Sequence, residues 1–273
     1  MLKKLLKYDL STVMKYWWIA AVTTIGMSVL SGFSLSVLTF ETLYLNVMIY
    51  VIAIIILFAT MLTYSALMIL SIVFIFVRFY KNFFTDEGYL TFTLPVKRSQ
   101  LLNSKIITAM ITTSATTIVI FSGIATIIGI GLVRVPEFWD EFNWLIGQIT
   151  GYLEGYTVVY IIELVLLMVL TTLSSVLFLF NCITFGAVIA KKAKVIAAIG
   201  VYYGASMIGS TILQIVAMSV TADLVILTEK VPEDSVFLLI GLGLLAVIFV
   251  VGLICTLLYT LQCWMLDKKL NLS

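Results

Sequence analysis

The chain has 273 residues, of which 62% are hydrophobic and only 11% are charged, and its mean hydropathy is +1.18. Soluble domains carry about 25% charged residues, so the composition excludes an ordinary soluble protein and indicates an all-α integral membrane protein. The chain contains no histidine, which removes the commonest metal ligand and acid–base group. The three cysteines, Cys182, Cys255 and Cys263, lie in apolar segments, and their odd number argues against a disulfide framework.

Residues 1–16 are predicted to form an amphipathic interfacial helix. Leu2, Leu6 and Leu10 recur at helical spacing, while lysines occupy another face. Such a helix lies in the headgroup layer, where its apolar face is buried and its lysines attract anionic lipid. Two interpretations stay open: a simple topological anchor, or an elbow helix that also packs near a cytoplasmic partner.

Six membrane spans follow within a single transmembrane domain that covers residues 1–273. We expect them at about residues 18–40, 45–77, 105–133, 156–190, 195–220 and 236–264. A span requires about 20 apolar residues. The second and fourth are roughly 33 residues long, or about 50 Å as helices, so we expect them to tilt, kink or project beyond the bilayer.

The distribution of charge predicts the orientation of these spans. Of the 16 Lys and Arg residues, all except Arg134 and Lys230 fall on one side of a six-span arrangement. Cytoplasmic loops retain basic residues, so both termini are predicted to be cytoplasmic. Most acidic residues fall on the opposite, outer side, including those of residues 136–149. That segment is predicted to be a short outer interfacial helix, because Pro136 suits a first helical position and aromatic residues gather on one face. It is either an aromatic anchor or a lid over an exit path.

Chemical motifs are scarce. The chain has no phosphate-binding loop and no zinc motif, and without histidine it cannot form a nucleophile–His pair. We therefore expect it not to be an enzyme and to hold no cofactor or metal. Glu163 is the only carboxylate predicted to lie within the membrane. An intramembrane acid suggests a functional site, although a carboxylate that reaches the interface or bonds within the bundle is an equally good explanation.

Hydroxyl groups recur along the third predicted span. Thr108, Thr112 and Thr116 share one face at i, i+4 spacing. Together with Glu163 they are the candidate lining of a translocation path. The alternative is that they bond to their own backbone or to a neighbouring helix, as Ser and Thr commonly do in membranes. In the fifth span, Gly200 and Gly204 form a G-x-x-x-G pattern, which serves helix packing either within the chain or between two subunits. We expect packing within the chain.

Between the second and third spans lies a cytoplasmic segment, residues 78–104, which is rich in basic and aromatic residues. Its sequence Phe84-Thr-Asp-Glu-Gly-Tyr-Leu-Thr-Phe-Thr-Leu-Pro-Val-Lys-Arg-Ser-Gln-Leu-Leu-Asn-Ser-Lys105 resembles a motif of ABC-2-type permease subunits of Gram-positive bacterial ABC transporters. The ending Leu266-Asp-Lys-Lys-Leu-Asn-Leu272 is similar to the usual C-terminus of that family, and the layout of helices is similar throughout. The outer loop between the fifth and sixth spans is short and acidic, without the re-entrant hairpin of lipid-exporting relatives, so their substrates are not carried over.

The resemblance implies a permease in a multi-pass arrangement in the bacterial plasma membrane. It would pair with a second permease, identical or paralogous, and with two copies of an ATPase subunit that bind ATP and Mg. It would use their hydrolysis to export an amphipathic peptide, lipid or drug. The resemblance also implies that the 78–104 segment contains the coupling helix. The residues that would dock on the ATPase are Thr85, Asp86, Glu87, Gly88, Tyr89 and Leu90.

Two other functions agree with the residues. A secondary transporter would work without an ATPase, driven by an ion gradient. A membrane sensor or scaffold would read antimicrobial peptides at the outer leaflet. A membrane enzyme that uses carboxylates alone is a more distant alternative.

Overall fold

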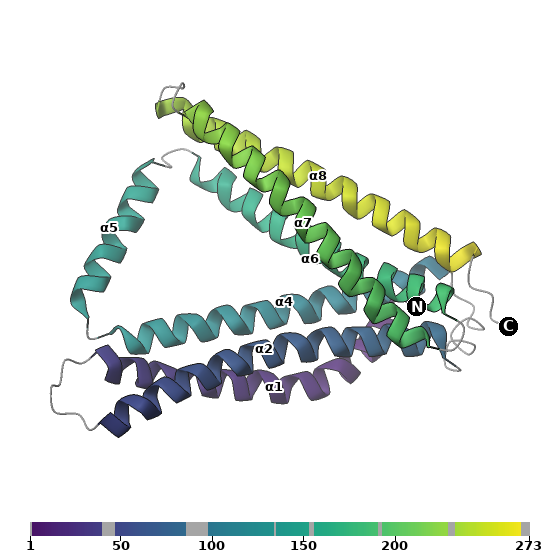
Figure 1. Cartoon of the computed structure of the whole chain (residues 1–273), viewed down its shortest axis with the longest axis horizontal. Coiled ribbons are helices and arrows are strands. Elements are labelled where there is room, and N and C mark those ends of the chain that lie inside the picture. The colour runs from purple at the N-terminus through teal and green to yellow at the C-terminus, as the bar shows by residue number, and fades with distance from the viewer. Residues whose placement is uncertain are drawn as a thin grey trace. The chain divides into compact units, whose positions relative to one another are not determined.

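The fold is built from long helices that follow the apolar segments of the sequence. The computed structural model describes residues 2–39, 47–85, 98–133, 135–152, 156–190, 193–228 and 233–268. These residues form helices and contain no strand (Figure 1). The helices are α1 (Leu2–Thr39), α2 (Val47–Phe84), α4 (Arg98–Gly131), α5 (Pro136–Tyr152), α6 (Thr157–Ile189), α7 (Lys194–Thr228) and α8 (Glu233–Lys268).

Among the described residues, six helices are long and apolar enough to cross a membrane, which confirms the expected all-α fold with six membrane-spanning helices. The candidate spans are Leu5–Thr39, Val47–Phe84, Arg98–Gly131, Thr157–Ile189, Lys194–Ile215 and Ile240–Leu266. Proline interrupts none of these helices. Pro136 stands at the first position of α5, where the missing backbone N–H removes no helical hydrogen bond.

The helices extend beyond several predicted ends. α1 continues without a break from Leu2 to Thr39, so the predicted interfacial segment and the first span are one helix. α2 continues to Phe84, and α4 begins at Arg98. Both ends of the predicted 78–104 cytoplasmic segment are therefore helical. The spans were predicted from runs of apolar residues, which show only the part of each helix that lipid can bury. The helices are longer than these runs because backbone hydrogen bonds continue into the polar residues on either side.

The chain divides into two compact units. Unit 1 comprises Met1–Arg78 and Leu101–Tyr152, and unit 2 comprises Phe79–Gln100 and Leu153–Ser273. Unit 1 thus contains α1, α5 and most of α2 and α4. Unit 2 contains α6, α7, α8 and the two helical ends that flank the cytoplasmic segment. The boundaries at 78/79 and 100/101 fall within helices and not in loops.

Hydroxyl groups and glycine bring the helices of unit 1 together. Gly123 of α4 lies directly against Ser28 of α1 and Tyr64 of α2, and a Cβ there would be 2.6 Å from either side-chain oxygen. The same two side chains bond to each other, with their oxygens 2.8 Å apart. Buried polar side chains between helices find partners in this way because lipid offers none.

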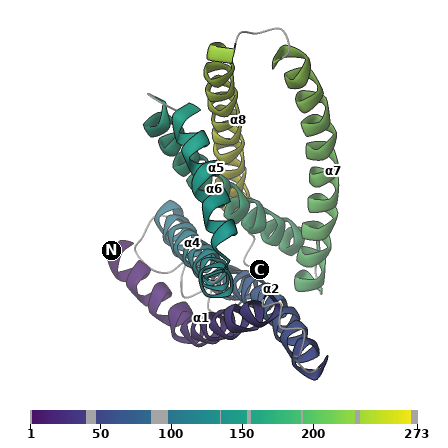
Figure 2. The same ribbon diagram turned by 90° about the vertical axis from the view of Figure 1, so that its left-hand side faces the viewer.

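In unit 2, α6 packs against both α7 and α8. Gly186 of α6 lies against Ala198 of α7, closer than any side chain would allow. Figure 2 shows α7 apart from α8 along its middle, whereas the end of α7 and the start of α8 lie nearer to each other. A Cβ added to Gly200 or Gly204 would meet no atom within 4 Å among the described residues. The expectation that this pair serves packing within the chain is therefore wrong for the described part, and Gly186 makes the close contact instead.

Candidate functional site

Of the residues expected to dock on an ATPase, the structure describes Thr85, which directly follows α2. Thr85 follows the helix and donates a hydrogen bond from Oγ1 to the carbonyl oxygen of Lys81, at 2.6 Å. Asp86, Glu87, Gly88, Tyr89 and Leu90 lie outside the described residues. What the structure describes is how the helices on both sides of this segment are held.

Within unit 2, aromatic stacking holds the end of α2. Phe79 and Phe83 are almost completely buried, with exposed fractions of 1% and 2%. The ring of Phe79 stacks on Phe180 of α6, with centroids 3.9 Å apart. On the other side of the segment, Arg98 donates from Nη1 to the carbonyl oxygen of Leu266, at 3.1 Å. Both ends of the segment are thus attached to helices of unit 2.

Within unit 1, a buried carboxylate holds the same two helices further along. Asp9 of α1 is 2% exposed. Lys105 of α4 donates from Nζ to both of its carboxylate oxygens, at 2.7 and 2.6 Å. Arg78 of α2 donates from Nη2 at 3.1 Å, and Ser104 donates from Oγ at 3.2 Å. We call these four residues the Asp9 cluster.

The Asp9 cluster joins three helices through one acid. Charge-assisted hydrogen bonds of this length are stronger than neutral ones, and removing one partner of a buried ion pair leaves an uncompensated charge. Lys105 is itself 8% exposed, so water offers little replacement. The guanidinium carbon of Arg78 also lies 5.4 Å from the ring centroid of Tyr8, an arrangement that favours a cation. The cluster therefore fixes α1 to the helices that lead into the cytoplasmic segment.

Sequence reasoning missed the Asp9 cluster, although it left a signal. Asp9 is the only acid in the first 40 residues, among four lysines. It also continues, by steps of four, the stripe formed by Val13, Trp17 and Ala21, which the structure buries. An acid on a buried stripe requires a cation from elsewhere in the fold.

The three threonines of the candidate path are buried within unit 1. Thr108, Thr112 and Thr116 each donate a hydrogen bond to the carbonyl oxygen four residues earlier, at 2.9 Å. Thr116 also accepts a hydrogen bond from Nε1 of Trp17 at 2.9 Å and pairs with Ser71 at 2.8 Å. Thr108 and Thr112 thus bond to their own helix, and Thr116 also bonds to α1 and α2, while their role in a path stays a prediction.

Glu163 lies in a different setting. It is 5% exposed, and its buried Oε2 has no hydrogen-bond partner among the described residues. Glu163 belongs to a stripe along α6 whose members alternate by three and four residues, the spacing of one helix face. The stripe consists of Tyr160, Glu163, Leu167, Leu170, Ser174, Leu177, Asn181 and Thr184.

This stripe faces α8. Tyr160 lies beside Gly241, and the thiol of Cys255 reaches the carbonyl oxygen of Leu170 at 3.5 Å. Farther along, Asn181 donates to the carbonyl oxygen of Leu258 at 3.0 Å, and Gln262 donates to Thr184 at 2.8 Å. Glu163 falls between the first two of these contacts, so its helix face is turned to a part of α8 whose residues are mostly apolar, 242–254.

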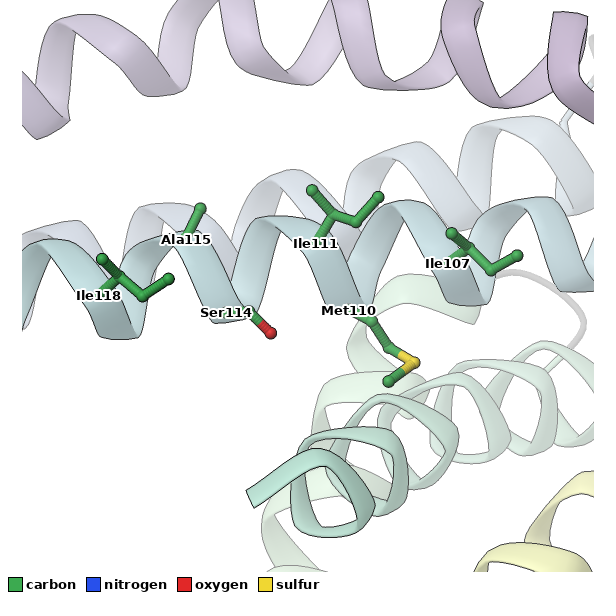
Figure 3. Close-up of a pocket in the computed structure, with 6 residues that line it drawn as sticks. All are labelled: Ile107, Met110, Ile111, Ser114, Ala115 and Ile118. Carbon is green, nitrogen blue, oxygen red and sulfur yellow. The ribbon is translucent and has the colours of Figure 1, made fainter. Parts of the chain in front are cut away.

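An apolar depression of about 460 Å³ borders α4 (Figure 3). It is lined by Ile107, Met110, Ile111, Ser114, Ala115 and Ile118. All six side chains come from one helix face, and Ser114 supplies the only polar side-chain atom among them. This lining offers an apolar surface with a single hydroxyl group.

The described residues contain no group of Cys, Asp and Glu side chains arranged to hold a metal ion. The chain matches no protein-family model, no curated protein and no solved structure.

Proposed function

We propose that the chain is the membrane-spanning permease subunit of a bacterial ABC transporter. In this proposal a separate ATPase subunit hydrolyses ATP, and the chain couples that hydrolysis to export of an amphipathic substrate across the plasma membrane. The ATPase would dock on the segment between α2 and α4, at Thr85–Leu90. A second permease, identical or paralogous, would complete the path.

The observation that carries the proposal is the double attachment of the cytoplasmic segment. Its ends are held in unit 2 by the Phe79–Phe180 stack and by Arg98. The same two helices are held in unit 1 by Asp9, through Arg78 and Lys105. Since helices transmit displacement along their length, a movement of the segment acts on both units. A coupling element requires this property, whereas a loop that merely joins two spans does not.

The attachment supports the following mechanism. Binding of ATP would close the ATPase dimer and move the docked segment. The movement would pass along α2 and α4 into unit 1 and through the aromatic stack into unit 2. Rigid elements with two arrangements, biased by a ligand, are how such movements reopen a path on the other side.

Exchange of charge at the docking segment tests the proposal. Asp86→Arg with Glu87→Arg should abolish co-purification with the ATPase, or leave ATP hydrolysis without transport. The chain offers a matched control, because Asp140 and Glu141 form the same dipeptide on the exposed surface of α5. Asp140→Arg with Glu141→Arg should keep both the complex and transport.

Unchanged co-purification and transport in the Asp86/Glu87 variant would refute docking at this segment. Ion-driven transport by the purified chain without any ATPase would identify a secondary transporter instead. Peptide binding at the outer face without any transport would identify a sensor.

A further inference from the structure

Glu163 is a buried acid for which the described residues of unit 2 supply no cation. The described basic side chains of unit 2 are Lys81, Arg98 and Lys194. Lys194 begins α7, beyond the end of α6, and Glu163 lies about 39 Å along α6 from Ile189 at 1.5 Å per residue. Lys81 and Arg98 lie near the same end, since Phe79 stacks on Phe180 and Arg98 bonds to Leu266. None of the three reaches Glu163.

An isolated carboxylate in an apolar setting is unfavourable unless it is neutralised or paired. Asp9 shows how this chain pairs a buried acid, with donors from two cations and a hydroxyl. The buried Oε2 of Glu163 receives no hydrogen bond from the part of the chain that the structure describes. Glu163 therefore supplies the negatively charged member of an ion pair, and no described residue of unit 2 supplies the positively charged member.

The site is also within reach of a molecule at the membrane boundary. Glu163 lies about 9 Å along α6 from Thr157, the first residue of the helix. An ammonium group on a flexible alkyl chain spans much of that depth, as lysine side chains do when they extend toward the headgroup layer. Apolar side chains such as Ile161, Ile162 and Leu164 are exposed beside it and suit the apolar part of such a molecule.

We propose that Glu163 binds the ammonium or guanidinium group of an amphipathic molecule between the ends of α6 and α8. Under the proposed function this molecule is the exported substrate, and the inference narrows the substrate class to cationic amphiphiles.

A matched pair of fluorescent probes tests the proposal without the ATPase. Dansylcadaverine carries a primary amine, and its N-acetyl derivative is neutral but otherwise similar. Binding of each would be measured on the purified full chain in phosphatidylcholine nanodiscs, so that anionic lipid does not collect the amine. The wild-type chain should bind the amine at least 10-fold more tightly than the neutral probe.

Glu163→Gln keeps the shape of the neutral acid and removes the charge. It should lose the preference for the amine and keep the weak binding of the neutral probe, while Glu163→Asp should retain a preference. Glu137→Gln is the control, because it removes an exposed acid of α5, and it should bind both probes as the wild type does.

Three results would overturn the proposal: an unchanged preference in Glu163→Gln, equal loss of both probes in that variant, or no preference in the wild type. The first would show that Glu163 does not bind the amine and serves helix packing instead. If the preference depends on Glu163 but the chain with its ATPase transports nothing, the site stands and the proposed function fails.

Discussion

Asp9 and Glu163 are two carboxylates buried to nearly the same degree, in different units of the same chain. Asp9 receives hydrogen bonds from Arg78, Ser104 and Lys105. Glu163 has an oxygen with no donor among the described residues. The difference shows that burial alone does not distinguish a structural carboxylate from one that can bind a ligand. A carboxylate whose partners come from its own fold holds helices together, and one whose partner is missing is available to a ligand.

The comparison predicts the largest effect at Asp9. Asp9→Asn would remove the charge that compensates Arg78 and Lys105, so the free energy of unfolding should fall by about 3–5 kcal/mol, as when one partner of a buried pair is removed. Unfolding in detergent, by heat or by added denaturing detergent, measures it. Asp140→Asn, at an exposed position of α5, should stay within about 0.5 kcal/mol of the wild type. Equal stability of both variants would mean that the Asp9 cluster does not brace unit 1.

A double-mutant cycle sharpens the assignment to Lys105. Lys105→Gln alone should also destabilise the chain, and Asp9→Asn with Lys105→Gln should be more stable than the sum of the two losses predicts. The expected coupling energy is about 1–3 kcal/mol, the range for residues that bond directly. Strict additivity would show that the two side chains act independently.

Two glycines of unit 2 differ in a similar way, because Gly186 lies against a neighbouring helix and Gly200 has no neighbour among the described residues. Gly186→Ala places a methyl group against Ala198 and should cost about 1–3 kcal/mol, as overpacking does. Gly200→Ala has open space among the described residues and should stabilise α7 by up to about 1 kcal/mol, because alanine favours the helix. A large loss at Gly200 in the purified, assembled protein would locate a second helix on that face.

The smallest effect, and one of opposite sign to that at Asp9, is expected at Glu163. Glu163→Gln removes a buried charge that has no described partner, so the free energy of unfolding should stay unchanged or rise by up to about 1 kcal/mol. The same unfolding assay measures it. A loss of several kcal/mol would contradict the comparison, because it would show that Glu163 has a stabilising partner within the folded chain.

The features that sequence reasoning predicted are those that depend on local composition. The six spans follow from continuous apolar runs, and α5 follows from Pro136 and the aromatic spacing after it. Glu163 was recognisable because no other acid stands inside a predicted span. The Asp9 cluster depends on contacts between residues 69 and 96 positions apart. Helical periodicity places Asp9 on a face, but it does not say which helix covers that face.

The same limit explains the glycines. Gly200 and Gly204 have the spacing that permits close packing, yet Gly186 makes the contact with α7. The spacing of glycines in one helix shows where a second helix could approach closely. Whether a helix lies there depends on the tertiary fold. The docking residues Asp86–Leu90 stay a prediction that rests on resemblance.

The most direct test of the division between the two acids is the shift in unfolding temperature that dansylcadaverine causes. A ligand that binds only the folded state raises stability with its concentration. The amine should raise the unfolding temperature of the wild type by several degrees. It should raise that of Asp9→Asn by a similar amount, although this variant unfolds at a lower temperature without ligand. The unfolding temperature of Glu163→Gln should not change. A full shift in Glu163→Gln, or its loss in folded Asp9→Asn, would contradict the account.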